Sequence, residues 1–452
     1  MHGVNQGKSG DDFKGLPIDI ILKLWNKLII IISPKKEVSR LHYNFYFDET
    51  YHDRKIAIKS SGQINTFTAD KNDSYVGVFW GIANTKQSST TKRLFALENK
   101  YLARYGLASE FKSVNIARKN FNSGVRSFNK DALDYYSDLF KLLEQVAPII
   151  HVNVVSKIEY LVRNIFDAVD IKRIPFVSPN SFYYSITKFL IYYHTPELIK
   201  ALCKTIETAD GTFFQEELLN HLECTMAALN GIPRKAREIP ALQQLHMVVS
   251  LCKFEKPIND KYDFIYFQNF DGLVRLLDER KISSQRSSIT IDREEATYQA
   301  ALAFPFKGVK QADSTQSVKV RMADHLCGFI GRMMYALMND KQLREDEVTD
   351  IDNLSANDLT RKRLLSSEWF DLKQAHFDLY MRAFRVLVVQ QEAHWATMTW
   401  SYCDQVSMFY TLLRYFGSFS NFEEYKKHRP EEHSEYYNAA CCDDLERHYA
   451  NL

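Results

Sequence analysis

Residues 41–58 read LHYNFYFDETYHDRKIAI, an aromatic run that ends in two adjacent carboxylates, Asp48 and Glu49. Tyr43, Phe45 and Phe47 alternate with His42, Asn44 and Tyr46. This is the period-two pattern of a strand with one face in a core. An acid at the end of such a strand is either a solvated turn residue or part of a metal site. The other acids of the chain bear on which alternative applies.

The bulk composition is that of an ordinary folded protein, with 452 residues, 45% hydrophobic and 25% charged. Single cores stop growing near about 250–300 residues, so the chain has room for two or three core-bearing units. The net charge of +2 gives no overall attraction to nucleic acid, and any basic binding surface must therefore be local. The seven cysteines include no C-x-x-C pair, which argues against zinc and for reduced thiols in a cytoplasm.

The N-terminal segment, residues 1–40, contains a greasy stretch at 18–33, IDIILKLWNKLIIIIS. Lys23, Asn26 and Lys27 interrupt it, and it falls short of the roughly 20 apolar residues of a membrane span. We expect a helix that packs on the protein's own core or on a second copy. A membrane-surface helix is the alternative.

Strand and helix patterns alternate in two parts of the chain, 41–160 and 260–338. Strands are predicted at 74–83 and 149–158, with two glycines in the first allowing close backbone approach. Residues 263–268 are a further strand candidate, and 287–302 and 315–339 each read as a strand passing into a helix. Helices are predicted at 90–106, with Gly106 as the stop, and at 129–147, as a capped amphipathic helix. An insertion at 161–259 is also predicted to be helical. In a C-terminal domain at 339–452, residues 340–362 are linker-like and everything from 364 onward is predicted to be helical.

Four acids stand at strand ends or helix starts: Asp48, Glu110, Asp292 and Asp324. Each alone is more often a cap or turn residue than a ligand. Together they suggest a mixed sheet that brings several carboxylates to one end, which is how a hard cation such as Mg²⁺ is held. In the helix that carries Asp324, Gly328 and Gly331 lie on the same side as the acid, and we expect them to let the helix approach the sheet end closely. The opposite side carries a core stripe of Met322, Leu326, Phe329, Met333 and Leu337.

The order of these motifs resembles a family of bacterial proteins grouped as domain of unknown function 3800. FYFDET resembles its F-x-D-E-S-G opening, SEFKS its E-[LIF]-K motif, SSITIDREE its later strand ending in Asp, and DSTQSVKVRMADHLCGFI its closing A-D motif. The similarity covers roughly residues 41–158 and 263–338. It departs where Thr50 and Tyr51 replace Ser-Gly, and where Arg321 stands near the place of a Gln.

The resemblance implies an α/β protein with a ribonuclease H-like mixed sheet, a large helical insertion and a helical C-terminal domain. It implies Asp48, Glu110, Asp292 and Asp324 as the acidic cluster, and a Mg²⁺- or Mn²⁺-dependent nuclease cutting RNA or DNA, in a setting such as bacterial antiviral defence. Two metal ions would serve such chemistry without a protein nucleophile. Two alternatives stay open: a non-catalytic interaction or scaffold protein that binds partners or itself through its helices, and a nucleotide phosphohydrolase.

Several neighbouring residues complete the candidate site. Strand alternation points Glu49 away from Asp48, so it ranks lower as a ligand. Lys112 either neutralises a phosphate or pairs with a nearby acid, and Arg321 is placed to contact a phosphate. A basic segment follows the Glu110 motif, and its interleaved rings Phe121 and Phe128 suggest binding of single-stranded nucleic acid. Ordinary loop composition is the alternative explanation of this segment. The basic residues of that segment are Arg118, Lys119, Arg126 and Lys130.

The histidines add little to the candidate site. His325 neighbours Asp324 but lies about 100° round the helix, and His394 reads as a core or groove residue. The C-terminal His428, His433 and His448 read as part of a solvated, charged face.

Overall fold

A mixed sheet lies at the centre of the computed structural model, which describes residues 41–51, 58, 64, 73–175, 177–232, 235, 238–254, 257–258, 266–347, 365–391, 396–399 and 401–449. Its strand order is β6-β5-β1-β2-β4-β7. β2 is antiparallel to β1 and β4, whereas the β1–β5, β5–β6 and β4–β7 pairs are parallel. The strands are β1 (Tyr43–Thr50), β2 (Ser74–Ala83), β4 (Ile149–Ser156), β5 (Ser287–Ile291), β6 (Gly308–Gln311) and β7 (Ala396–Thr399).

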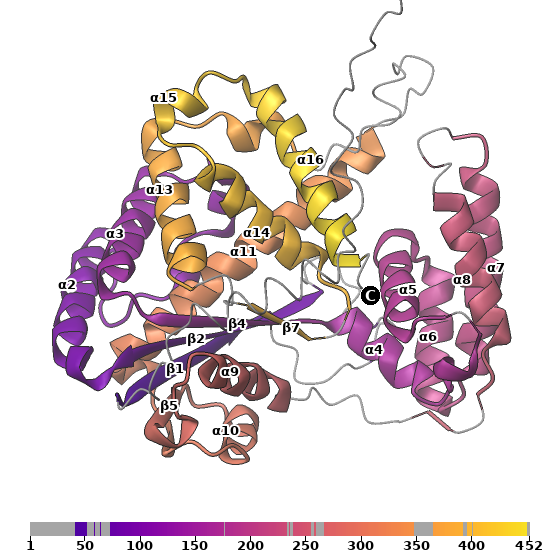
Figure 1. Ribbon diagram of the computed structural model, residues 1–452, viewed down its shortest axis with the longest axis horizontal. Coiled ribbons are helices and arrows are strands. Elements are labelled where there is room, and N and C mark those ends of the chain that lie inside the picture. Colours follow the sequence, from indigo (N-terminus) through magenta and orange to yellow (C-terminus); the bar gives the residue numbers. More distant parts are fainter. Residues whose placement is uncertain are drawn as a thin grey trace, which may run out of the picture.

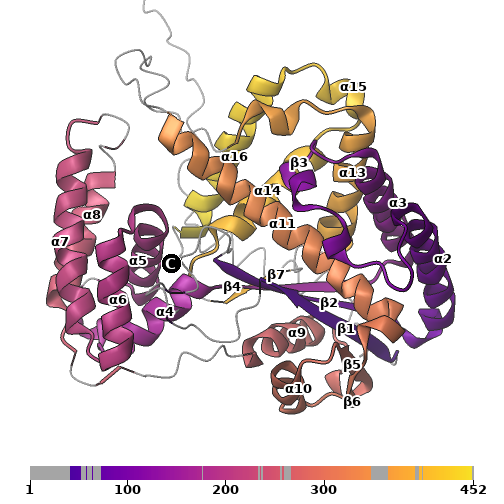
Figure 2. The same ribbon diagram turned by 180° about the vertical axis from the view of Figure 1, so that it is seen from behind.

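Helices cover both faces of the sheet (Figures 1 and 2). One face carries α9 (Phe267–Glu279) and α10 (Glu295–Leu302). The long helix α11 (Val318–Glu347) crosses the other face beside β1 and β2. Further helices stack on that side: α2 (Gln87–Tyr105), α3 (Lys130–Val146), α13 (Gln374–Phe384), α14 (Asp404–Gly417), α15 (Phe422–Tyr425) and α16 (Pro430–Tyr449).

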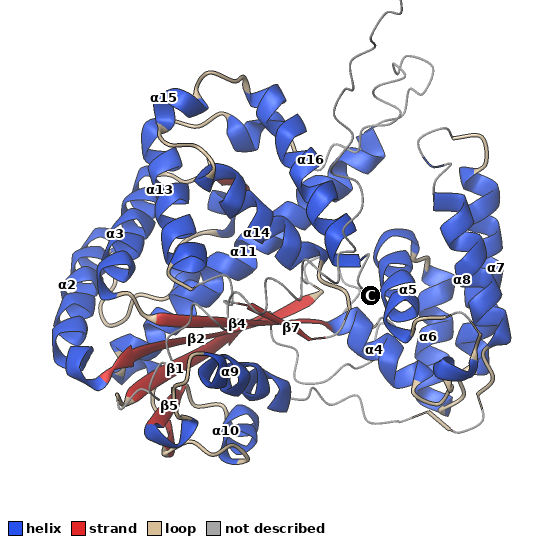
Figure 3. Cartoon of the chain, viewed as in Figure 1, coloured by secondary structure: helices blue, strands red, loops and turns tan. Residues whose placement is uncertain are grey.

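The insertion forms a helical lobe at one side of the sheet (Figure 3). No strand occurs among its described residues, so the prediction of a helical insertion is confirmed for them. Its helices are α4 (Lys157–Phe166), α5 (Pro179–Tyr193), α6 (Pro196–Thr208), α7 (Thr212–Leu229) and α8 (Glu238–Leu251).

The alternation in β1 divides its side chains between two cores. Phe45 and Phe47 pack with β5 and α9 on one face, whereas Tyr46 belongs to the larger core beneath α11. The predicted close approach at the β2 glycines is confirmed, because a Cβ added to Gly77 would lie 2.9 Å from the Phe47 ring, and one on Gly81 would meet the Phe45 ring. The small residues therefore make room for the aromatic side of β1.

Other predictions of secondary structure are also confirmed. Gly106 ends α2 in the left-handed conformation with φ 65°, and the Asn129 side chain caps α3. The predicted stripe on α11 is buried at Met322, Leu326, Phe329, Met333 and Leu337.

The predicted strand at the start of 315–339 is wrong. A 3₁₀ turn at Ser314–Gln316 leads directly into α11, which begins at Val318, so Asp324 lies in the second helical turn and not the first. The valines at 318 and 320 imitate strand alternation over a short window, but apolar positions continue at helical spacing to Leu337. The same helix runs through Glu347, into residues expected to be a linker.

Three further expectations are corrected. Residues from 364 onward are not all helical, because β7 (Ala396–Thr399) pairs with β4. Phe267 and Gln268, expected at the end of a strand, begin α9. The edge strand β6 was not predicted at all, since four residues with one apolar side chain carry little periodic signal.

Two predictions lie outside the described residues, namely the N-terminal helix within 1–40 and the placement of His394. Among the helices that are described, none is both long enough and apolar enough to cross a bilayer.

Candidate acidic site

Two of the four predicted acids stand on neighbouring parallel strands. Phe47 of β1 pairs with Ile291, the last residue of β5. Asp48 is the next residue of β1, and Asp292 directly follows the end of β5. Successive side chains of a strand point to opposite faces. Because Phe47 and Ile291 face the α9 core, both aspartates lie on the side of the sheet that carries Tyr46 and α11.

The third acid, Asp324, is brought to the same place by the glycines of α11. A Cβ on Gly328 would meet the Ser113 side chain, and a Cβ on Gly331 would lie 2.6 Å from Thr50 Cγ2. Both contacts are too close for any larger residue without movement. The expectation that these glycines let the helix reach the sheet end is confirmed.

The electrostatics show that these acids face one another. Burial raises the pKa of Asp48 well above its usual value, and the negative charges of Asp324, Glu49 and Asp292 raise it further. The backbone N–H of Glu49, 2.8 Å from Asp48 Oδ1, opposes the shift only in part. In the described part of the chain, Asp48, Asp292 and Asp324 form no ion pair with a cation. The strand ends thus gather negative charge without balancing it.

Backbone amides fix two of the carboxylates. The Ser113 N–H donates to Asp324 Oδ2 at 2.6 Å, and the Ser113 hydroxyl donates to Oδ1 at 2.7 Å. Asp292 Oδ1 accepts from the N–H groups of Arg293 at 2.8 Å and Ser314 at 3.2 Å. Two loops, 111–116 and 312–317, therefore set the orientation of these side chains.

Glu110 lies at the start of the first loop, three residues before Ser113. Its Oε1 pairs with Lys112 Nζ at 3.3 Å, so Lys112 contacts a neighbouring acid, as one of its two predicted roles required. Glu110 Oε2 is buried and has no hydrogen-bond partner among the described residues. The structure thus places Glu110 on the loop that holds Asp324.

Glu49 points to the other face of the sheet, as alternation predicts. Its Oε2 accepts a hydrogen bond from the Tyr75 hydroxyl at 3.3 Å, and Tyr75 contacts Tyr266 on the α9 side. Glu49 affects the site through its charge on Asp48.

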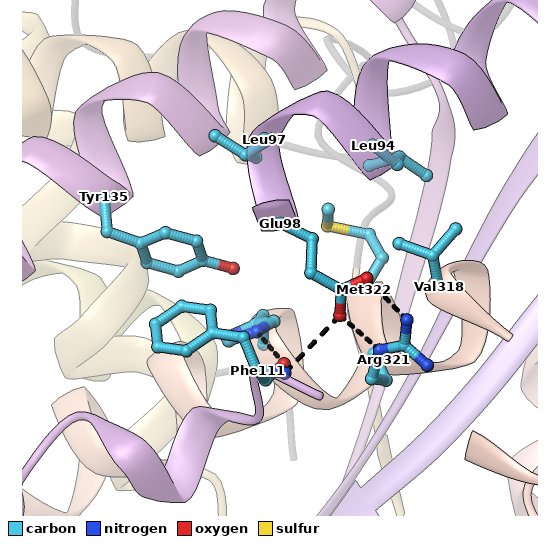
Figure 4. Close-up of a pocket in the computed structure, with 9 residues that line it drawn as sticks. Leu94, Leu97, Glu98, Phe111, Tyr135, Val318, Arg321 and Met322 are labelled. Atoms are coloured by element: carbon cyan, nitrogen blue, oxygen red, sulfur yellow. Dashed lines mark hydrogen bonds and ion pairs between the residues drawn. The ribbon is translucent and has the colours of Figure 1, made fainter. Parts of the chain in front are cut away.

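Arg321 does not reach the acidic cluster, so its predicted contact with a phosphate is wrong. It is 3% exposed and forms an ion pair with Glu98 of α2 (Figure 4). A third contact runs from its Nη1 to the Ser314 carbonyl oxygen. The helix face that bears Arg321 turns toward α2, which the sequence alone did not reveal.

The predicted basic segment is only partly available for binding. Phe121 and Phe128 are buried and both pack against the Tyr136 ring of α3, so the expected base-stacking rings are not exposed. Arg126 pairs with Asp371 at 3.0 Å. The prediction that Phe121 and Phe128 stack on bases is wrong, because both rings belong to the protein core.

The other three basic residues of that segment are exposed. Lys119 and Lys130 lie on the surface, and the guanidinium of Arg118 stands 3.6 Å from the centroid of the Tyr335 ring. Tyr335 in turn stacks on Tyr51, which follows β1.

His325 and His433 are both buried. Burial lowers the pKa of His325 to about 4, and its Nε2 lies 2.9 Å from the Phe111 carbonyl oxygen. The predicted solvated tail is wrong at His433, because this ring is buried and stacks on Tyr425 with centroids 3.9 Å apart. His428 is exposed, as expected, and the side chain of His448 lies outside the described residues.

Ser113 is the site residue that sequence reasoning missed. Its only signal was a polar position two residues after Phe111 in the SEFKS motif, and nothing in the pattern indicated a partner 211 positions away.

Within the described residues, no group of three or more His, Cys, Asp and Glu side chains is arranged so that it could hold a metal ion as it stands. Comparison with models of protein families found no match. Searches among curated proteins and solved structures also found none.

Proposed function

We propose that this chain is a metal-dependent nuclease that hydrolyses phosphodiester bonds, with Asp48, Asp292 and Asp324 as the carboxylates that hold Mg²⁺ or Mn²⁺. The observation that carries the proposal is geometric: the β1–β5 register and the close approach of α11 at Gly328 and Gly331 bring acids from three distant segments together. Burial and the charges of Asp324, Glu49 and Asp292 raise the pKa of Asp48 accordingly. Acids with strongly shifted pKa values cluster at functional sites.

The donor chemistry fits a hard cation. All three side chains offer oxygen ligands, which Mg²⁺ and Mn²⁺ prefer, and the buried Glu110 Oε2 is an additional oxygen without a partner among the described residues. A bound cation would offset the charge repulsion at Asp48. When bound, such an ion supplies Lewis acidity toward a phosphoryl oxygen and a polarised water.

The sheet also supports the proposal. An antiparallel β2 flanked by β1, with β5 and β6 continuing in parallel, is the arrangement expected of a ribonuclease H-like sheet. In such a sheet the parallel strands β1 and β5 end at one edge, and their terminal acids meet there.

Arg118 is the residue that we expect to contact the nucleic-acid substrate. It is exposed, its guanidinium lies on the Tyr335 ring, and it forms no ion pair or hydrogen bond with another described residue. A cation held over a ring suits a nucleic-acid phosphate or base. Arg126, which already pairs with Asp371, is the less available of the two.

The test is cleavage of labelled RNA and DNA with Mg²⁺ or Mn²⁺ by wild type, Asp48→Asn and Asp324→Asn. We expect the variants to lose at least about 100-fold in rate, the scale of a single electrostatic group in catalysis. Asp371→Asn, which alters an exposed aspartate elsewhere, should cleave like wild type. Equal cleavage by all four proteins would contradict the proposal.

A scaffold role is the second candidate, and one observation favours it. Asp324 and Asp292 already anchor the Ser113 and Ser314 amides, so both acids have a structural use without a metal. A scaffold should bind no divalent cation at millimolar concentration. A nucleotide phosphohydrolase would instead act on mononucleotides in the same assay.

A further inference from the structure

A buried ion pair lies behind the acidic site, between α2 and the first turn of α11 (Figure 4). Glu98 is 7% exposed and Arg321 is 3% exposed. The Arg321 Nε and Nη2 atoms donate to the two carboxylate oxygens of Glu98. This bidentate geometry is the strong and directional form of an arginine–carboxylate pair.

The remaining polar contacts of the pair reach the two loops that orient the site acids. The N–H of Phe111 lies 3.5 Å from Glu98 Oε1, as the dashed line in Figure 4 marks. Arg321 Nη1 donates to the carbonyl oxygen of Ser314, whose own N–H holds Asp292. One ion pair thus contacts both loops.

The first loop is also held along its length by α11. His325 lies 2.9 Å from the Phe111 carbonyl oxygen, and Arg332 Nη1 donates to the Ile116 carbonyl oxygen at 2.6 Å. Between these points Ser113 holds Asp324. The Glu98 contact is therefore one of the polar contacts that fix the backbone on either side of Ser113.

We propose that Glu98 and Arg321 are positioning residues that set the orientation of Asp324 and Asp292 for a divalent cation, acting through the Ser113 and Ser314 backbone. This inference rests on the proposed function. Groups that orient metal ligands from behind typically change metal affinity by about 10–100-fold when removed. A buried pair that served stability alone could often be replaced by apolar residues without loss.

That contrast defines the test. The double variant E98M/R321M removes both charges and fills the space, so it should fold with an unfolding midpoint close to that of wild type. We expect its Mn²⁺ affinity, measured by calorimetry, to fall by about 10–100-fold. Hydrogen exchange followed by mass spectrometry should become faster in peptides covering 111–116 and 312–317.

A control is E144M/R385M, which removes a partly exposed ion pair between α3 and the π-helical turn Arg385–Val389 after α13, together with the Glu144–Arg382 pair. It should leave Mn²⁺ affinity unchanged. If E98M/R321M does not fold, Arg321→Lys keeps a charge beside Glu98 but loses the fork that reaches Ser314, and a several-fold weaker Mn²⁺ affinity is expected.

The outcomes separate the two claims. Mn²⁺ binding by wild type with affinity and exchange unchanged in the folded variants would overturn the positioning role and leave the proposed function standing. Wild-type protein that binds no Mn²⁺ would overturn both. Weaker binding together with faster loop exchange, seen only in the Glu98 and Arg321 variants, supports the inference.

Discussion

Two groups of acids lie near the ends of the parallel strands, and they differ in charge balance. Beyond β4 and β7, Glu159 accepts hydrogen bonds from the Ser401 and Tyr402 amides at 2.9 and 2.7 Å and pairs with Arg163 at 2.7 Å. Near the ends of β1 and β5, burial raises the pKa of Asp48, and the charges of three neighbouring acids raise it further.

The difference separates a structural group from a candidate functional one. A buried carboxylate with a cation and several donors is satisfied and ties segments together, as Glu159 ties α4 to the turn after β7. Buried like charges cost free energy, and proteins retain such costs mainly where activity requires them. Asp48 belongs to the second kind.

The largest expected effect is on the balanced group. Glu159→Ala removes the hydrogen bonds from the Ser401 and Tyr402 amides and the ion pair with Arg163, so the free energy of unfolding should fall by about 3–5 kcal/mol. Urea denaturation monitored by circular dichroism measures it. A loss below about 1 kcal/mol would mean that Glu159 is no more than a surface-type pair, and the comparison would break.

Divalent cations should act only on the unbalanced group. At a free Mn²⁺ concentration 100 times its dissociation constant, wild type should gain about 2.7 kcal/mol in free energy of unfolding. Asp48→Asn should gain little under the same conditions, because it removes a ligand. Equal gains in the two proteins would place the cation elsewhere.

In the metal-free protein, ionisation of Asp48 should lower the free energy of unfolding as pH rises. The pKa is raised in the folded state, so this group's contribution to stability is fully present below its unfolded pKa and is lost as pH rises through the folded pKa. Asp48→Asn should remove that loss and raise the free energy of unfolding near pH 8 by about 0.5–2 kcal/mol. Thermal melts in EDTA across pH 5–8 measure the slope, and an unchanged slope would argue against the charge repulsion.

The smallest expected effect concerns the substrate side. Arg118→Ala should weaken binding of a single-stranded oligonucleotide and reduce the slope of log affinity against log salt by about 1, as for loss of one phosphate contact. Arg126→Ala, which loses the Asp371 pair instead, serves as the control and should leave the slope unchanged. Fluorescence anisotropy in EDTA avoids cleavage, and equal slopes for both variants would remove Arg118 from the binding surface.

Much of the core was predictable from the sequence because its signals are local. The alternation around Phe47, the buried run of β2 and the capped helix α3 follow from patterns of a few residues. Asp48, Asp292 and Asp324 were found because each adjoins such an element. The contacts that bring these acids together were harder to predict. The need for a glycine at Gly328 follows only from the Ser113 side chain that packs against it.

The errors have a common physical cause, which is contact between distant segments. Arg321 looked like a phosphate ligand because Glu98, its partner on another helix, lies 223 positions away. β7 was read as helix because its four residues become a strand by pairing with β4. Phe121 and Phe128 were predicted to be available for base stacking, but both rings are buried against α3.

The central claim is that Asp48, Asp292 and Asp324 together bind a divalent cation. Crystals soaked in MnCl₂ test it most directly, through anomalous scattering recorded at the manganese edge. We predict an anomalous peak in contact with these three carboxylates. A fully soaked crystal in which the peak is absent, or lies away from Asp48, would contradict the account.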